Sequence, residues 1–256
     1  MIKLLCTDFD GTIFEEGGNP VISHRFLDLV RRLQQRGMKW IVSTGRDVDE
    51  VVSTLRFHGI TETMPDYMSV VERKIYKREG DVYRSVEPWN AVCMETHRKL
   101  FHKIAPRVEE IREWIKKDYG SSILYEDKYS PLCLICPDNG EADHVLAKVS
   151  AALENISELS IVRNDVYSRL AHCNYNKGAT LLELEKMLGI SPEEVVVAGD
   201  HYNDLTMLNP TLSKHLITPR NALNKVREHI RQVGGWVSEL CYADGVADGL
   251  EHFIKK

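Results

Sequence analysis

The chain has 256 residues, of which 43% are apolar and 28% are charged, and its formal net charge is −5. That length is sufficient for one large domain or two smaller ones, and the apolar content excludes global disorder. The modest negative charge argues against a dedicated binder of nucleic acid or of anionic membranes. We therefore expect a globular protein.

Membrane and secretion signals are not expected from this sequence. No run approaches the roughly 18 apolar residues of a membrane span, and the first residues, MIKLLC, lack the pattern of a signal peptide. The scattered cysteines indicate reduced thiols in the cytoplasm rather than a disulfide framework. Cys133 and Cys136 have CxxC spacing, but residues three apart in a strand face opposite sides. We therefore expect them to pack in a core rather than share a metal.

The N-terminal part predicts two strands that alternate with two helices. Residues 2–8 are an apolar strand, and a helix follows from about Ser23, the expected N-cap, to Gly37. Residues 39–44 predict a second strand. Residues 47–59 predict a second helix, which has acidic residues at its start and glycine at its end.

The C-terminal part continues this alternation. A helix is expected over 176–190, and the run Val195–Ala198 predicts a strand. Further alternating segments are expected at 215–218, 221–230, 235–240 and 245–254. Because alternating strands and helices imply parallel pairing, we predict an α/β fold in which both ends of the chain form one doubly wound, mostly parallel, Rossmann-like sheet.

The middle of the chain has a different pattern. Residues 74–86 predict a hairpin, and a helical run from about 91 to 118 contains Pro106, which should break or kink it. The remaining expected elements are strands at 122–126 and 130–136, a helix at 141–154 and a strand at 158–163. This pattern predicts a core formed by 1–86 and 170–256, with an α/β domain inserted at 87–169.

Asp8 and Asp10 follow the first apolar strand, in the stretch CTDFDGTIF. Side chains two apart in a strand share a face, and ligands bind at the carboxyl edge of open α/β sheets. Gly11 permits a tight turn, and Thr12 can tie that turn to its own backbone. Taken alone, the pair fits an acidic turn and a catalytic pair about equally.

Polar residues follow other predicted strands in the same way, and they change that balance. They are Thr44, Gly45 and Arg46 after the second strand, Asp200, Asn203 and Asp204 in VVVAGDHYND, and Lys177 at the start of a helix. Each has an ordinary explanation as turn chemistry, a helix cap or a solvated helix start. Together, at one edge of a parallel sheet, they indicate a site.

In this order the motifs resemble those of the haloacid dehalogenase-like (HAD) phosphohydrolases. DFDGT is similar to the first HAD motif, STGR to the second, Lys177 to the third and GDHYND to the fourth. The position of the insertion resembles subclass IIB, in which it is an α/β cap domain that sets specificity. That subclass includes the Cof-like sugar phosphatases and the sucrose-phosphate-phosphatase group.

The resemblance implies catalytic roles for the two aspartates. Asp8 would be the nucleophile that becomes an aspartyl-phosphate, and Asp10 would protonate the leaving alcohol and then activate water. An adjacent acid is useful because an alcohol is a poor leaving group. Two carboxyl groups with divergent pKa values suit such divided roles.

The resemblance also implies a Mg²⁺ site and a phosphate site. Asp8 and Asp200 would bind the metal by their side chains and Asp10 by its backbone carbonyl, and these hard oxygen ligands favour Mg²⁺. Asp204 would support the metal from its outer shell. The phosphate would be held by Thr44, Lys177 and Asn203. Arg46 would orient the second-motif loop or contact the cap.

One stretch departs from the family pattern. Many relatives have a glycine-containing segment after the third strand, where this chain has VVERK, with Glu72 and Arg73. The loop facing the substrate would then differ in charge and bulk, so sugar specificity does not transfer directly.

The function expected from these features is a cytoplasmic, Mg²⁺-dependent phosphatase for a small phosphorylated metabolite, such as a sugar or polyol phosphate. Nucleic acid and membranes are not expected partners. A phosphotransferase of the phosphomannomutase type remains an alternative, because it shares these motifs and this cap type. A non-catalytic HAD-fold regulator is disfavoured because Asp8, Asp10, Lys177 and Asp200 are all present, and a dehalogenase because Asp10 would have no leaving group to protonate.

Overall fold

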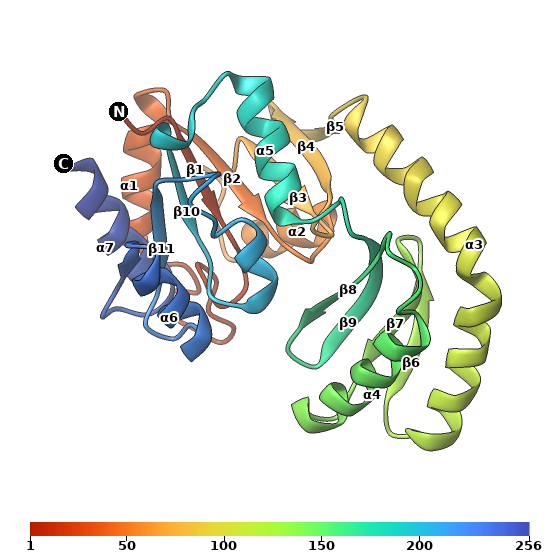
Figure 1. The fold of residues 1–256 in the computed structure, drawn as a ribbon. Coiled ribbons are helices and arrows are strands. Elements are labelled where there is room, and N and C mark those ends of the chain that lie inside the picture. The colour runs from red at the N-terminus through yellow and green to blue at the C-terminus, as the bar shows by residue number, and fades with distance from the viewer. Residues whose placement is uncertain (256) are drawn as a thin grey trace. The chain divides into compact units, whose positions relative to one another are not determined.

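The computed structural model describes residues 1–255, and the chain forms two compact units (Figure 1). One unit consists of Met1–Glu87 with Asn176–Lys256, and the other is Pro88–Tyr175. Each unit has a sheet of its own. Among the described residues, no helix is both long and apolar enough to cross a membrane.

The first unit contains an eight-stranded sheet in the order β12-β11-β10-β1-β2-β3-β4-β5. Its strands are β1 (Leu4–Thr7), β2 (Lys39–Ser43), β3 (Tyr67–Val70), β4 (Lys74–Glu79), β5 (Val82–Ser85), β10 (Val195–Ala198), β11 (His215–Thr218) and β12 (Trp236–Val237). The strands from β12 to β3 pair in parallel, and the hairpin β4–β5 adds antiparallel strands at one edge. The predicted mostly parallel Rossmann-like sheet is confirmed.

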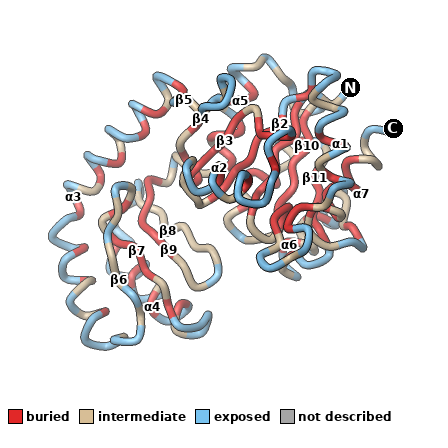
Figure 2. Tube along the Cα trace, turned by 180° about the vertical axis from the view of Figure 1, so that it is seen from behind, coloured by how far each residue is buried: buried red, intermediate tan, exposed pale blue. Residues whose placement is uncertain are grey.

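Helices pack with this sheet, and their apolar faces complete the core. They are α1 (His24–Gln35), α2 (Val48–Phe57), α5 (Lys177–Leu188), α6 (Asn224–Gln232) and α7 (Tyr242–Ile254). Phe26 of α1, Val51 of α2 and Val246 of α7 pack in one cluster with alternate strand residues such as Leu5. The next residue along β1, Cys6, faces the opposite side of the sheet, as the strand alternation requires. Figure 2 shows the buried trace concentrated in the central strands.

Local sequence signals start the helices where expected. Ser23 precedes α1, and its hydroxyl accepts a hydrogen bond from the backbone of Phe26 at 3.3 Å. Asp47 forms a capping box with Glu50 at the start of α2, which satisfies two backbone donors that the first helical turn leaves free.

The second unit combines a four-stranded antiparallel sheet, in the order β6-β7-β9-β8, with two helices. Its elements are α3 (Trp89–Asp118), β6 (Ile123–Asp127), β7 (Ser130–Ile135), α4 (Asn139–Ala152), β8 (Leu159–Asn164) and β9 (Tyr167–His172). Ile111 of α3 and Val145 of α4 pack with Leu134 of β7 in its core. Cys136 belongs to this cluster, whereas Cys133, also buried, lies on the other face of the strand, as expected for core packing.

Two details of this unit differ from what the sequence pattern indicated. Pro106 was expected to break or kink the helical run, and α3 is not broken there but runs as one curved helix (Figure 1). Proline removes the hydrogen bond to the carbonyl of His102, but both residues are exposed, so water can bind that carbonyl. The strand β9 was not predicted, because its sequence YSRLAH mixes polar and apolar residues without a clear alternation. Its pairing with β7 and β8 makes it a strand.

Candidate active site

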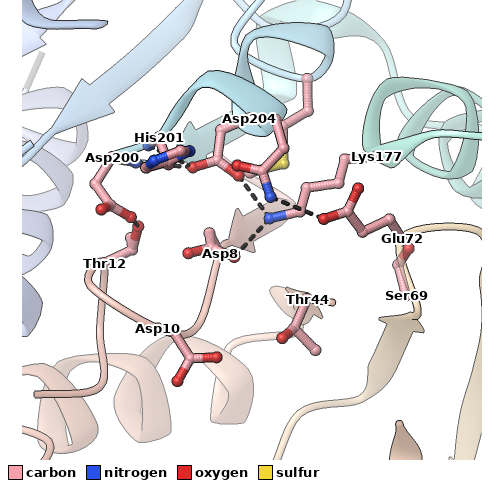
Figure 3. A network of polar contacts seen from close by, with 12 residues as sticks. Asp8, Asp10, Thr12, Thr44, Ser69, Glu72, Lys177, Asp200, His201 and Asp204 are labelled. Atoms are coloured by element: carbon pink, nitrogen blue, oxygen red, sulfur yellow. Dashed lines mark hydrogen bonds and ion pairs between the residues drawn. The ribbon is translucent and has the colours of Figure 1, made fainter. Parts of the chain in front are cut away.

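The site residues of the first unit lie where the central parallel strands end. Asp8 follows β1, Thr44 follows β2, and Asp200 lies two residues beyond β10. Because β1 pairs in parallel with both β2 and β10, the carboxyl ends of these strands are neighbours. Figure 3 shows the side chains of Asp8, Lys177 and Asp204 converging there.

Lys177 is the centre of this cluster. Its Nζ donates to Asp8 Oδ1 and to Asp204 Oδ1, both at 2.6 Å, and its side chain is only 1% exposed. Burial alone would lower the lysine pKa, but the charges of Asp204 and Asp8 outweigh it and hold the pKa well above its usual value. Lys177 is therefore a buried, permanently charged group beside Asp8.

Gly178, the residue after Lys177, has to be small because the backbone of another segment lies close to it. A Cβ at Gly178 would lie 2.1 Å from the backbone oxygen of Thr206, in the turn Tyr202–Thr206. Glycine allows the start of α5 to approach this turn, which places Lys177 next to Asp204.

Asp204 is fully buried and uses both carboxylate oxygens within the protein. Oδ1 accepts from Lys177, and Oδ2 accepts from the backbone N–H groups of Asp200 and His201 at 2.9 and 3.0 Å. With its oxygens occupied in this way, Asp204 fixes the loop that carries Asp200.

Asp8 and Asp200 keep oxygens available for a ligand. One oxygen from each of Asp8, Asp200 and Asp204 falls in a group whose atoms all lie within 4.8 Å of one another. Asp200 Oδ1 accepts a hydrogen bond from the hydroxyl of Thr12 at 2.5 Å. The sequence had suggested that this hydroxyl bonds to the backbone of its own turn, and it bonds to Asp200 instead. The carboxylate oxygens of Asp8 and Asp200 that do not bond to Lys177 or Thr12 are the candidate ligand atoms for a metal ion.

The electrostatics of this cluster suit a cation. Burial and the charge of Asp204 raise the pKa of Asp200 to about 7, and burial and Asp204 also raise the pKa of Asp8 well above its usual value. Clustered carboxylates are unfavourable unless a positive charge compensates them. Lys177 supplies one such charge, and this set of oxygen donors also fits a hard divalent cation.

Asp10 lies outside the Asp8–Lys177–Asp204 cluster (Figure 3). Its two carboxylate oxygens accept hydrogen bonds from Arg46, at 2.9 Å from Nε and 2.5 Å from Nη2. The sequence predicted that Arg46 orients the second-motif loop or contacts the cap. The structure adds a pair of hydrogen bonds from Arg46 to Asp10, the residue expected to act as the general acid.

Thr44 is buried, and its backbone is held on both sides. Its N–H donates to Ser69 of β3 at 2.8 Å, and its carbonyl accepts from the N–H of Glu72 at 3.0 Å. The Thr44 hydroxyl accepts from the N–H of Arg46 at 3.1 Å, which leaves the hydroxyl proton for another acceptor.

Glu72 is a site residue that the sequence did not assign to a role. It is 5% exposed, and its Oε1 accepts from the side-chain amide of Asn203 at 2.8 Å. Val71 and Glu72 have φ values of +44° and +64°, a left-handed conformation that is unusual for residues other than glycine. The signal in the sequence was the segment VVERK, in which Glu72 and Arg73 stand where the resemblance to the family led us to expect a glycine-containing segment.

The fold and the arrangement of these carboxylates with Lys177 define an HAD-like phosphohydrolase. The family model for Sucrose-6F-phosphate phosphohydrolase matches residues 1–254. The chain belongs to this family, as the resemblance to subclass IIB predicted.

Curated relatives and solved structures agree with this assignment. The chain is 22% identical to a 5-amino-6-(5-phospho-D-ribitylamino)uracil phosphatase of Bacillus subtilis, covering 99% of this chain and 96% of that protein. It is 23% identical to a phosphoglycolate phosphatase of Methanoculleus marisnigri, covering 99% and 97%. The sucrose-phosphatase of Synechocystis, solved with sucrose and phosphate, shares the fold with a TM-score of 0.71 at 18% identity, covering 99% of each chain.

Proposed function

We propose that this protein is a Mg²⁺-dependent phosphatase that hydrolyses a small phosphorylated metabolite, a sugar or polyol phosphate, through an aspartyl-phosphate. The observation that carries the proposal is the contact of the buried Lys177 with Asp8, beside Asp200. A carboxylate nucleophile next to a fixed cation and to free carboxylate oxygens suits phosphoryl transfer, which depends on positioning and charge stabilisation.

The metal would be held by the side chains of Asp8 and Asp200 and by the backbone carbonyl of Asp10, with Asp204 fixing the Asp200 loop. When bound, Mg²⁺ neutralises charge on the phosphoryl oxygens and favours the ionised form of Asp8. These ligand atoms are all oxygens, which supports Mg²⁺ over metals that prefer sulfur or imidazole.

The reaction has two steps, and Asp8 and Asp10 act in both. In the first, the Asp8 oxygen that Lys177 does not contact attacks phosphorus, the ester P–O bond breaks, and Asp10 gives its proton to the departing alkoxide. In the second, Asp10 takes a proton from water, the resulting hydroxide attacks phosphorus, and inorganic phosphate leaves Asp8. Lys177, Thr44 and Asn203 would hold the phosphoryl oxygens throughout.

The substrate class follows from the family and its relatives. Relatives named for a ribitylamino-uracil phosphate and for phosphoglycolate, together with the sucrose-phosphate family, support a small phosphomonoester. We propose that the inserted domain, expected at 87–169, is the cap that selects among such substrates. The free cysteines among the described residues fit a reducing cytoplasm.

A phosphate-release screen tests the proposal. Sugar, polyol, cofactor and nucleotide monophosphates are incubated with the protein and Mg²⁺, with Asp8→Asn as the matched inactive control. Release from sugar or polyol phosphates without a bisphosphate activator supports the phosphatase. Phosphate release only from nucleotides would refute the substrate class. Transfer to a second sugar that requires a bisphosphate would identify a mutase instead.

A further inference from the structure

The guanidinium of Arg46 donates hydrogen bonds to both carboxylate oxygens of Asp10. Nε lies 2.9 Å from Oδ2 and Nη2 lies 2.5 Å from Oδ1, the paired geometry in which a planar guanidinium fixes both the position and the plane of a carboxylate. The residues are 36 positions apart and follow different strands, β1 and β2. The pair is therefore built by the tertiary fold.

Arg46 is itself held on several sides. Its third nitrogen, Nη1, donates to the hydroxyl of Thr54 in α2 at 3.1 Å. The guanidinium carbon lies 5.3 Å from the ring centre of Phe9 and 5.2 Å from that of Phe14, within the range of a cation–π contact. Its side chain is 30% exposed. An arginine that contacts both aromatic rings and bonds to Thr54 can impose its orientation on Asp10.

The backbone of Arg46 belongs to the loop of Thr44. The Arg46 N–H donates to the Thr44 hydroxyl, and the Arg46 carbonyl accepts from Val71 at 2.9 Å. The same residue thus ties the Asp10 carboxyl to the loop that is expected to hold phosphate. A displacement of either one would be transmitted to the other.

We propose that Arg46 is a positioning residue that aims the Asp10 carboxyl at the leaving-group oxygen, an inference that rests on the acid–base role given to Asp10 in the proposed function. When Asp10 carries its proton, one oxygen still accepts from Arg46 and the other holds the proton for the alkoxide. After the P–O bond breaks and the proton has moved, both oxygens return to Arg46. The guanidinium therefore keeps at least one hydrogen bond to the carboxyl group in each half-reaction.

This role has a signature that a structural role lacks. An acid is needed when the leaving group is a poor one, such as an alkoxide, and is much less needed for 4-nitrophenolate. The ratio kcat/KM reports steps up to the first irreversible one, so it isolates the transfer of the phosphoryl group to Asp8. Loss of the Asp10 orientation should therefore reduce kcat/KM in proportion to leaving-group basicity.

The test compares benzyl phosphate, phenyl phosphate and 4-nitrophenyl phosphate with Mg²⁺. We expect Arg46→Met to reduce kcat/KM for benzyl phosphate about 10²-fold and for 4-nitrophenyl phosphate less than about tenfold. Arg46→Lys, which keeps the charge and loses the paired geometry, should fall between wild type and Arg46→Met. Arg25→Met is the matched control, because Arg25 makes a similar paired contact with Glu251 away from the site, and it should match wild type on all three substrates.

The outcomes separate the two proposals. An equal loss on all three substrates, or no loss on any, would overturn the role of Arg46. Asp10→Asn serves as the benchmark: if it shows no leaving-group dependence, the acid role in the proposed function fails. If Asp10→Asn discriminates and the Arg46 variants do not, only the present inference fails. Should Arg46→Met melt below the assay temperature, Arg46→Lys carries the same comparison.

Discussion

The carboxyl group of Glu72 accepts a hydrogen bond from the side-chain amide of Asn203 at 2.8 Å, although the two residues are 131 positions apart. Glu72 is almost completely buried, so its oxygens are removed from water at this point. A buried carboxyl group depends on the few donors it has, because an unmet acceptor costs about 1–3 kcal/mol. The contact links the turn after β3 to the loop that carries Asp200.

This link predicts coupling between the two residues in unfolding. Asn203→Ala should lower the free energy of unfolding by about 1–2 kcal/mol more when Glu72 is present than in a Glu72→Ala background. Only when Glu72 is present does the substitution leave a buried carboxyl group without its hydrogen-bond donor. Urea unfolding of the two single variants and the double variant measures the difference. Costs that add to within about 0.3 kcal/mol would show that the contact contributes nothing.

Asp8→Asn should abolish turnover and leave the fold intact. The amide cannot act as the nucleophile, so we expect kcat to fall at least about 10⁴-fold. Folding should survive, because the change removes one of several neighbouring negative charges and keeps an oxygen for Lys177. The exposed Asp49→Asn is the control and should be fully active. Substantial turnover by Asp8→Asn would refute the aspartyl-phosphate.

Binding of Mg²⁺ should weaken as the pH falls. The pKa of Asp200 is raised to about 7, so below that pH a proton competes with the metal for its carboxylate. For this group alone, the apparent Kd for Mg²⁺ should rise about tenfold between pH 8 and pH 6. Titration calorimetry at both pH values measures it, and Asp200→Asn should bind poorly at each. Equal affinity for Mg²⁺ at pH 6 and pH 8 would contradict this pH dependence.

The need for the metal is tested separately. A chelator should stop turnover, and added Mg²⁺ should restore it.

Glu185 of α5 should destabilise the protein at alkaline pH. It is 5% exposed, its Oε1 has no hydrogen-bond partner among residues 1–255, and burial raises its pKa from 4.5 to about 7. The folded state therefore binds this proton more tightly than the unfolded state, and stability falls as the pH rises from about 4.5 through 7. Glu185→Gln should gain about 1–3 kcal/mol at pH 8 and little at pH 4.

Urea unfolding at the two pH values checks this result. Glu228→Gln, the same change at an exposed position of α6, should leave stability unchanged at both. A pH-independent effect of Glu185→Gln would mean that packing, rather than the charge, sets its contribution.

Most of the fold was predictable because its signals are local. Alternating apolar strands and capped helices predicted the parallel sheet, and Ser23 and Asp47 begin their helices in the structure. The predictions failed where neighbours decide the conformation. β9 has no clear periodicity and is a strand through its pairing, and α3 continues through Pro106 because the interrupted turn faces solvent.

The sequence by itself determined which chemical groups are present and where they lie relative to predicted strands and helices, since apolar runs and helix starts are local properties of the chain. This was sufficient for the family and for the expected roles of Asp8, Lys177 and Asp200. Only the tertiary structure decided the pairing of these groups: Lys177 with Asp8 and Asp204, Arg46 with Asp10, and Glu72 with Asn203. Hydrogen bonds and ion pairs act over a few ångströms, so partners distant in sequence are fixed only when the strands are packed side by side.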